Sequence, residues 1–467
     1  MSRSVAREIQ VSGVRVQRGE VLVPTKIGDP VHGMLSCPAA PLVAASLEAR
    51  GHHIRPVELP RSDDDGVFDA LLYLVTCPQA DGSTAAIAAA VAPGDGLGAA
   101  AAKTVVDEWA SVSGNRSLLA AGSPWCSGAM HAASVARQAA AQHRGTGQTV
   151  RVLRPQAMAA EALADLAMMG AVISDSLAEA EPGDVVVLPA HGVTPEMRAE
   201  AAQRGITTVD ATCPFIASAQ ETARRVAERG HHLVLIGQRG HPAAAGIASQ
   251  AAGHVTVLET AGGASALRVT DNRPVSYLMQ PGVPVEATAA VAGALRSRFP
   301  AVRSTPAGEI CYAPSDRAGT IHAVATGSDL VLVLGDPRSP DARQVCGQAR
   351  DAGARAQIIP DVADIKPEML ASVHTIGLAE STTVPAGLAA RVISVLSGLG
   401  RLSVARRQLS TDLAESGQAL RNSGITDSNL TSRSSGNGHA GPSDTDETAP
   451  ATGHAATART ASSGVLA

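Results

Sequence analysis

The sequence predicts an α/β protein. Short apolar runs alternate with Ala-rich stretches of helical length along most of the chain, and this alternation is typical of parallel sheets joined by crossover helices. The 467 residues are 45% hydrophobic but only 2% aromatic, so the cores must be built mainly from Ala, Val, Leu and Ile. The length corresponds to roughly three domains at about 150 residues each. The strand-like runs are Glu20–Pro24, Ala70–Thr76, Val150–Leu153, Asp184–Leu188, His232–Ile236 and Leu330–Leu334.

Charge and composition exclude several classes of protein. A formal net charge of −5 and few aromatic side chains give no basis for binding nucleic acid. The first twenty residues lack the apolar stretch of a signal peptide, and the Ala-rich run 85–102 is interrupted by Pro93 and Asp95, so we expect no membrane span. We therefore expect a cytoplasmic protein. Its six cysteines should be reduced there, as buried thiols, metal ligands or catalysts.

Residues 1–115 are expected to form an N-terminal α/β unit of unknown role, because strand-like and helix-like runs alternate within it. The polar stretch Ser111–Arg116 is expected to link it to the rest of the chain. The predicted elements are strands at Val21–Pro24, Ile54–Leu59 and Leu71–Thr76, and a helix over Ala39–Arg50 that ends at Gly51.

A second pattern occurs three times: an extended segment, a tight turn containing a cysteine, and then a helix. The instances are SLLAAGSPWCSG, ITTVDATCPFI and STPAGEICYAP, which contain Cys126, Cys213 and Cys311. The intervals are similar, so three βα modules could each present one thiol to a common centre. Thiolates are favoured at such turns, and three of them would leave one iron of a [4Fe–4S] cluster free to bind a substrate oxygen. From spacing alone the signal for a cluster is weak, because isolated cytosolic cysteines are more often small buried side chains.

The surrounding motifs favour the cluster. SPWCSGAMHAASVARQAA, LPAHGV, DATCPFI, GQRGHPAAAG and EICYAP follow one another in this order, with an RFP turn at Arg298–Pro300. Over Leu118–Leu399 the chain resembles the 4-hydroxy-3-methylbut-2-enyl diphosphate reductase family. The resemblance implies that residues 116–402 form three similar α/β modules around a central [4Fe–4S] cluster. It also implies reductive dehydroxylation of an allylic diphosphate to isopentenyl and dimethylallyl diphosphate, the last step of the methylerythritol phosphate route to isoprenoids, with ferredoxin or flavodoxin as electron donor.

The resemblance also assigns roles to individual residues. An imidazole can donate a hydrogen bond to a phosphate oxygen, and hydroxyl groups can do the same. By position in the motifs, the cluster ligands are Cys126, Cys213 and Cys311, and the diphosphate-binding residues are His191, His241, Ser339 and Thr383.

Other positions depart from the family pattern. The family's proton-relay Glu after the GHP motif corresponds to Ala243, its early diphosphate-binding His to Ala159, and its TQTT stretch to Met279–Gly282 with Pro281 in place of a Thr. In the SSN triplet, Asp341 replaces Asn. A general acid typically contributes ~10²–10⁴-fold to a rate, so the ordinary reaction should be impaired unless another acid acts. Asp341 and Glu380 are candidates by alignment, and the catalytic acid stays unassigned.

Weaker signals are read as structural. The run Gly94–Gly98 is an incomplete dinucleotide fingerprint, and His52–His53 and His231–His232 lie where solvated polar residues are ordinary. Isolated thiols without close partners in sequence are usually packed side chains. This interpretation covers Cys37, Cys77 and Cys346.

Residues 403–467 are predicted to form a mostly disordered tail, because from Thr426 onward large apolar side chains are nearly absent. Two alternatives to the reductase stay open at this stage. One is a non-catalytic or redirected [4Fe–4S] protein with a sensor or interaction role and an altered substrate site. The other is an α/β binding protein without a metal.

Overall fold

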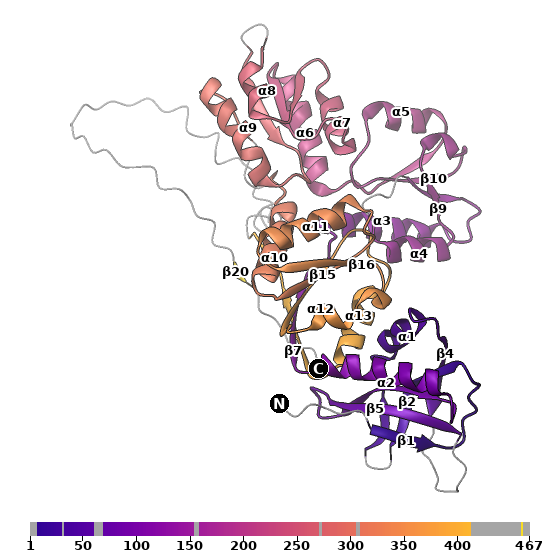
Figure 1. Cartoon of the computed structure of the whole chain (residues 1–467). Coiled ribbons are helices and arrows are strands. Elements are labelled where there is room, and N and C mark those ends of the chain that lie inside the picture. Colours follow the sequence, from indigo (N-terminus) through magenta and orange to yellow (C-terminus); the bar gives the residue numbers. More distant parts are fainter. Residues whose placement is uncertain are drawn as a thin grey trace, which may run out of the picture. The chain divides into compact units, whose positions relative to one another are not determined.

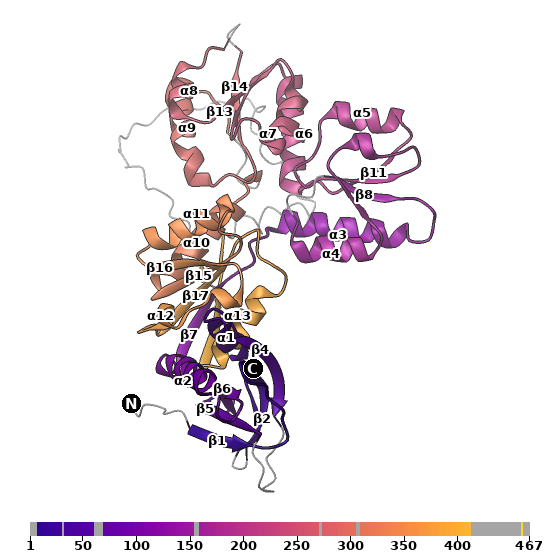
Figure 2. The same cartoon turned by 45° about the vertical axis from the view of Figure 1, so that its right-hand side comes forward.

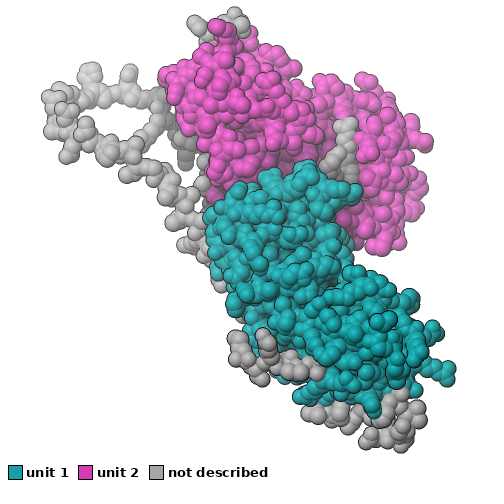
Figure 3. Space-filling model, viewed as in Figure 1, with its two compact units in different colours: residues 1–124, 318–408, 461–467 teal, residues 125–317, 409–460 magenta. Residues whose placement is uncertain are grey.

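The computed structural model describes residues 7–29, 32–59, 69–153, 158–269, 273–304 and 309–411, and the backbone of 459–460. The fold is mixed α/β, as the sequence predicted. The chain divides into two compact units, coloured separately in Figure 3. Unit 1 consists of residues 1–124, 318–408 and 461–467, and unit 2 consists of 125–317 and 409–460.

The N-terminal part of unit 1 is a six-stranded sheet with the strand order β1-β5-β6-β3-β2-β4. The predicted helix and three strands of this region are present, with boundaries shifted by a few residues. The elements are β1 (Arg7–Val11), β2 (Glu20–Asp29), β3 (Gly33–Ser36), α1 (Ala40–Glu48), β4 (His53–Leu59), β5 (Ala70–Pro78), β6 (Thr84–Val91) and α2 (Gly96–Ser111).

This sheet is not parallel throughout, which corrects the expectation from the alternating pattern. β2 and β4 run parallel, whereas β1–β5 and β5–β6 are antiparallel. The β5–β6 connection is a hairpin at Asp81 and Gly82, where Gly82 has φ +84°, a backbone conformation that favours glycine. β6 comes from the Ala-rich run 85–102, to which no strand was assigned in sequence.

The second part of unit 1 is a parallel five-stranded sheet with the order β16-β15-β17-β7-β18. Helices α10 and α11 lie beside β15 and β16 in Figure 1. The elements are β7 (Arg116–Ala121), α10 (Ala313–Thr326), β15 (Leu330–Leu334), α11 (Pro340–Asp351), β16 (Arg355–Ile359), the 3₁₀ turn Val362–Asp364, α12 (Pro367–Leu370), β17 (Thr375–Glu380), α13 (Leu388–Ser397) and β18 (Leu402–Arg407).

One hydrophobic core joins the two parts of unit 1. It contains Trp109 of α2, Leu332 of β15 and Leu396 of α13, all essentially inaccessible to solvent. Helices α1 and α13 are in contact and lie next to one another in Figure 2. A Cβ atom added to Gly398 would lie 2.5 Å from the backbone nitrogen of Ala39. The N-terminal part of unit 1 is therefore packed directly onto the part that contains the five-stranded sheet.

Unit 2 contains two further parallel sheets. A four-stranded sheet has the order β11-β10-β8-β9, and a three-stranded sheet has the order β13-β12-β14. The strands are β8 (Val150–Leu153), β9 (Val172–Ser174), β10 (Val185–Leu188), β11 (Thr207–Asp210), β12 (His232–Ile236), β13 (Val255–Leu258) and β14 (Val275–Met279). The helices are α3 (Ser127–Gln142), α4 (Ala160–Met168), α5 (Pro195–Gln203), α6 (Pro214–Glu228), α7 (Pro242–Ala248), α8 (Ala261–Ala266) and α9 (Val285–Arg298), with 3₁₀ turns at Leu177–Glu179 and Ser249–Ala251.

Each of the three cysteines in question lies on the connection from one parallel sheet to the next. Cys126 follows β7 of the five-stranded sheet and precedes α3, which packs on the four-stranded sheet. Cys213 follows β11 and precedes α6, which packs on the three-stranded sheet. Cys311 follows the three-stranded sheet and precedes α10, which packs on the five-stranded one.

The C-terminal region begins in ordered structure. The predicted tail starts at residue 403, but 402–407 form β18, which pairs with β7. Residues Leu409–Ser410 form β19, paired antiparallel with β20 (Arg459–Thr460). The remainder of the predicted tail, 412–458 and 461–467, lies outside the described residues. Within the described residues, no helix combines the length and apolar character that crossing a membrane requires. The division into domains at about 115 and 402 stays a prediction.

We predict that Gly398→Ala destabilises unit 1, because the new methyl group would meet the backbone of Ala39. Overpacking of this kind costs about 1–3 kcal/mol. At Gly347 in α11 an added Cβ would meet nothing within 4 Å, so Gly347→Ala is the matched control and should be neutral or stabilising by up to ~1 kcal/mol. Thermal or denaturant unfolding of both variants checks this. Equal stability of the two variants would contradict the close packing of α1 on α13.

Candidate functional site

Three thiols of unit 2 lie at the N-terminal ends of helices. Cys126 and Cys213 occupy the N-cap positions of α3 and α6, and Cys311 lies two residues before α10 begins. The first turn of a helix presents unpaired N–H groups and the positive end of the helix dipole. Such positions are suited to holding a group that carries negative charge when bound.

Gly128 brings the first two thiols together. A Cβ atom at this position would overlap the sulfur of Cys213 and lie 3.8 Å from the sulfur of Cys126. Both sulfurs thus lie close to the same glycine. Burial raises the pKa of the Cys311 thiol, and the other two cysteines raise it further. The structure therefore brings together Cys126 and Cys213, while the convergence of Cys311 with them stays a prediction.

Burial governs the protonation of these thiols. It raises the pKa of Cys213 and raises that of Cys311 to about 11. Backbone N–H groups act in the opposite direction, those of Phe215 and Ile216 on Cys213 and those of Ala313 and Gly282 on Cys311. Without a metal, Cys311 is protonated at neutral pH, and a metal must displace its proton on binding.

The DATC motif fixes the position of Cys213. The carboxylate of Asp210 accepts hydrogen bonds from the backbone N–H (3.0 Å) and hydroxyl (2.5 Å) of Thr212, and it pairs with Arg198 at 2.8 Å. The backbone N–H of Cys213 then donates to the carbonyl of Ala190 at 2.9 Å. This bond ties the second thiol to the turn that carries His191.

His191 and His241 form an adjacent pair. Their ring centroids are 5.0 Å apart with an interplanar angle of 74°. His241 is the N-cap of α7, where its Nδ1 accepts a hydrogen bond from the N–H of Ala243 at 3.1 Å. In the neutral ring Nε2 must then carry the proton and act as donor. Burial lowers the pKa of both rings, and His241 lowers that of His191 further.

A small pocket of about 100 Å³ adjoins His191. Apolar side chains such as Leu153 and Met197 line it, together with Gly192 and Gly246. The side-chain nitrogen of Gln220 is buried without a hydrogen-bond partner, and Cβ atoms on these two glycines would lie 2.7 and 3.0 Å from it. Gln220 of α6 therefore separates the His191 turn from α7.

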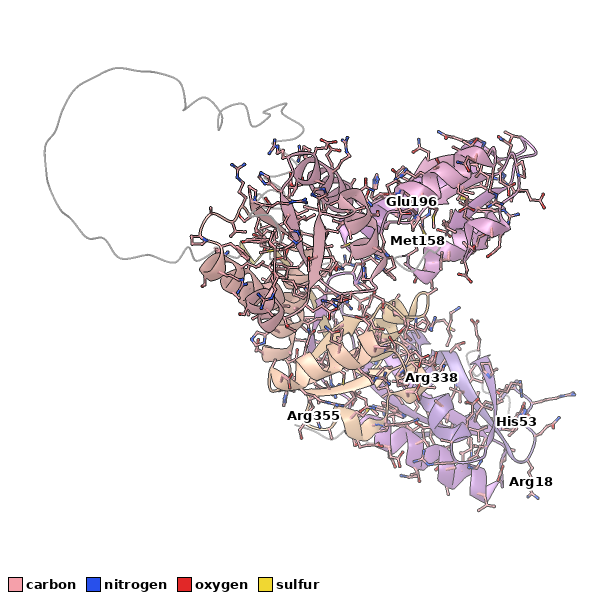
Figure 4. The ribbon with its side chains drawn as sticks, turned by 90° about the horizontal axis from the view of Figure 1, so that it is seen from above. Arg18, His53, Met158, Glu196, Arg338 and Arg355 are labelled. Atoms are coloured by element: carbon pink, nitrogen blue, oxygen red, sulfur yellow. The ribbon has the colours of Figure 1, made fainter. Side chains whose placement is uncertain are left out.

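Ser339 and Thr383 belong to unit 1 and lie at the carboxyl edge of its five-stranded sheet. Ser339 is the N-cap of α11 and accepts a hydrogen bond from the N–H of Ala342 at 3.4 Å. The hydroxyl of Thr383 accepts one from the N–H of Asp336 at 3.2 Å, which links the loops after β15 and β17. Arg338 lies in the loop after β15 and is labelled in Figure 4. Its side chain is 90% exposed and is paired with Asp336.

The departures from the family pattern have structural counterparts. Ala243 is fully buried and packs with Cys213 and Ile216. The carboxylate of Asp341 accepts a hydrogen bond from the N–H of Thr382 at 2.6 Å, so it is already used in holding the loop after β17. Ala159 is the N-cap of α4, and residues 154–157 before it lie outside the described residues.

Two glycines contribute to the site of the cysteines but were not predicted from the sequence to do so. Gly128 was not singled out, although its close spacing to Cys126 in Cys-Ser-Gly was a visible signal. Gly282 was considered only as part of the altered TQTT stretch, whereas its N–H interacts with the sulfur of Cys311. The side chain of Gln280, which precedes it by two residues, accepts a hydrogen bond from the N–H of Gln238 at 2.8 Å and so anchors the end of β14.

Most of the weaker signals have structural contacts, and His231 and His232 are half-buried rather than solvated, with hydrogen bonds to Ser276 and Thr256. Asp95 caps α2 by accepting a hydrogen bond from the N–H of Gly98 at 3.0 Å. It also accepts one from the N–H of Gly19 at 2.9 Å. Its carboxylate would repel the phosphate of a dinucleotide bound there. Cys37, Cys77 and Cys346 are buried. In the described part of the chain, no three His, Cys, Asp or Glu side chains are grouped in a way that could hold a metal ion.

The fold and the site define an α/β protein with three thiols and a histidine pair in one compact unit. A family model described as LytB protein matches residues 118–397, and the chain belongs to this family. It is 36% identical over 259 residues to 4-hydroxy-3-methylbut-2-enyl diphosphate reductase 2 of Mycobacterium bovis, covering 55% of this chain and 79% of that relative. It is 36% identical over 240 residues to the Bordetella bronchiseptica reductase, covering 51% and 74%.

A solved structure has the same fold. It is that of the E-1-hydroxy-2-methyl-but-2-enyl-4-diphosphate reductase from Plasmodium falciparum, with a TM-score of 0.54 and 21% sequence identity. The match covers 63% of this chain and 92% of the other. The resemblance stated from the motifs is thus confirmed at the level of the family.

We predict that Gly192→Ala destabilises unit 2 by more than Gly230→Ala. Both glycines have φ +71°, so each substitution costs about 1–2 kcal/mol of backbone strain. Only at Gly192 would the new methyl group also meet Gln220, since nothing lies within 4 Å of a Cβ at Gly230. Denaturant unfolding of both variants measures the difference. Adding Gln220→Ala should relieve the extra cost at Gly192, and failure to do so would contradict the contact.

Proposed function

We propose that this chain is a 4-hydroxy-3-methylbut-2-enyl diphosphate reductase acting in isoprenoid biosynthesis in the cytoplasm. The observation that carries the proposal is the meeting of the thiols of Cys126 and Cys213 at Gly128, next to the turn that carries His191. Membership of the LytB family and the names of the relatives support the same conclusion.

Cys126, Cys213 and Cys311 would hold a [4Fe–4S] cluster. Three properties of the site fit this group: helix N-termini at or near each thiol, backbone N–H groups directed at two of the sulfurs, and a glycine where a larger residue would displace Cys213. N–H groups and a partly apolar surrounding tune such clusters. The thiols of a cluster bind different iron atoms, so they need not converge on one point as the ligands of a single ion must.

The reaction consumes two electrons and two protons, breaks the allylic C–O bond and releases water. A bound cluster would supply the electrons and a Lewis-acid iron for the substrate hydroxyl, with ferredoxin or flavodoxin as the proposed donor. His191 and His241 would hold the diphosphate, and Ser339 and Thr383 would donate hydroxyl hydrogen bonds to it. The neutral tautomer of His241 has its Nε2 proton free for this purpose.

The source of the substrate protons is not assigned. Ala243 stands where the family has its relay Glu, and it is buried in an apolar setting. This observation favours a second candidate function, a [4Fe–4S] protein in a sensor or interaction role without the ordinary reaction. The two functions differ in whether an allylic diphosphate alters the spectrum of the cluster and is turned over.

We predict that the anaerobically reconstituted chain binds about four iron and four sulfide ions and reduces the allylic diphosphate with dithionite and a viologen carrier. The rate should lie ~10²–10⁴-fold below that of a relative with the Glu, since general acid help is missing. Iron analysis, absorption spectra and product analysis check this.

Matched variants separate the cluster from the reaction. Cys213→Ser and Gly128→Ala should lose most iron, whereas Cys346→Ala, which removes a buried thiol of α11 in unit 1, should retain it. Equal iron in Cys213→Ser and the wild type would refute the ligand assignment. A cluster without turnover, and without a spectral change on adding substrate, would favour the second function.

We further predict that inorganic pyrophosphate binds with uptake of protons near pH 7. Burial lowers the pKa of His191 and His241, so both rings are neutral in the free protein, and a nearby anion must raise these pKa values. Affinity should therefore increase as the pH falls toward the ordinary histidine range. Calorimetry in buffers of different ionisation enthalpy measures the uptake.

The histidine variants identify the groups responsible. His191→Gln and His241→Gln should reduce proton uptake, while His231→Gln is the control, because His231 lies before β12 and hydrogen-bonds Ser276. Proton uptake that is unchanged in both site variants would contradict their role.

A further inference from the structure

Cys311 is held differently from the other two thiols. Cys126 and Cys213 directly precede α3 and α6 as their N-cap residues. Cys311 instead lies in a loop, and no strand or helix begins at the next residue. Its position therefore depends on the contacts of neighbouring residues, in addition to the N–H groups of Ala313 and Gly282 that interact with its sulfur.

Glu309, two residues before Cys311, is bound to α6. The hydroxyl of Thr222 donates to the Glu309 carboxylate at 3.1 Å and accepts from Arg225 at 2.7 Å. Arg225 also lies 3.9 Å from the other carboxylate oxygen. The Thr222 hydroxyl thus uses both its donor and an acceptor site within the group. The Glu309 side chain is only 19% exposed, so solvent screens these bonds less than at an open surface.

The helix that receives Glu309 is the one that begins at Cys213. Thr222 and Arg225 lie between two and four turns along α6 from Cys213, and a packed helix transmits position with little bending. The group therefore fixes the loop of the third thiol relative to the second thiol.

Two further anchors hold the first turn of α10, which follows Cys311. Ser315 accepts from the N–H of Val285 at 2.9 Å and donates to Glu286 at 2.8 Å. Asp316 accepts from the N–H of Thr411 at 3.1 Å and from its hydroxyl at 2.5 Å. With these contacts on the C-terminal side, Glu309 provides an anchor on the N-terminal side among the described residues.

We propose that Glu309, Thr222 and Arg225 form a positioning group that fixes Cys311 relative to Cys213. The proposal rests on the proposed function, in which these cysteines hold the cluster. The three residues themselves hold the loop and make no contact with substrate in this assignment. Partners outside the ligand set typically contribute ~10–100-fold to metal affinity.

The first test measures release of iron from the reconstituted chain to a chelator. Thr222→Val and Arg225→Gln should release iron ~10–100-fold faster than the wild type, and Thr222→Ser should restore the wild-type rate. Arg224→Gln is the matched control, because Arg224 is the neighbouring residue but pairs with Glu221 and Glu228 of its own helix. Wild-type rates in both Thr222→Val and Arg225→Gln would overturn the proposal.

The second test needs no cluster. In the metal-free chain, alkylation of each cysteine by iodoacetamide is followed by peptide mass spectrometry. Thr222→Val and Arg225→Gln should accelerate alkylation of Cys311 severalfold while leaving Cys213 and the thermal midpoint unchanged. Equal acceleration at both cysteines would indicate general loosening of the fold and would overturn a specific positioning role.

The two readouts separate this proposal from the proposed function. If the wild-type chain binds no iron, the cluster assignment fails, and the alkylation rates still decide whether the group positions Cys311. If iron binds but neither readout responds to the substitutions, the positioning proposal fails and the cluster assignment stands.

Discussion

The packing of the Cys213 sulfur against Gly128 is the constraint on which the site depends. It requires the first turns of α3 and α6 to approach without an intervening side chain, and only glycine permits this approach. The bond from the N–H of Cys213 to the carbonyl of Ala190 then aligns the His191 turn with the same point. Thiol and histidine positions are thus set by backbone geometry more than by the side chains themselves.

The connections between the sheets explain how cysteines that are far apart in sequence share the same kind of position. The three cysteines lie on the connections between successive parallel sheets, and each connection ends in a helix that packs on the next sheet. Helix N-termini are natural sites for anionic groups. One architectural rule therefore accounts for the separation of the thiols in sequence and for their common electrostatic setting.

Much of the fold could be predicted from the sequence, because strands that are buried on both faces are continuous apolar runs. All six such runs became strands, from β2 to β15. The antiparallel β6 was missed because its Ala-rich composition is equally typical of helices. The cysteines were found through their motifs, whereas the roles of Gly128 and Glu309 depend on contacts between segments distant in the chain. Such contacts leave no periodic signal; the Cys-Ser-Gly spacing pointed to Gly128, but its contact with Cys213 and that of Glu309 with Thr222 are seen only in the folded structure.

Because unit 1 is built from separate stretches of the chain, its parts become available for folding at different times during synthesis. Its core joins residues before 124 with residues after 318, and β18 pairs with β7 only once Arg407 has been synthesised. Unit 2 is encoded between these segments. The N-terminal sheet must therefore emerge from the ribosome long before its packing partner, and it carries an apolar face through the synthesis of the entire thiol-bearing unit.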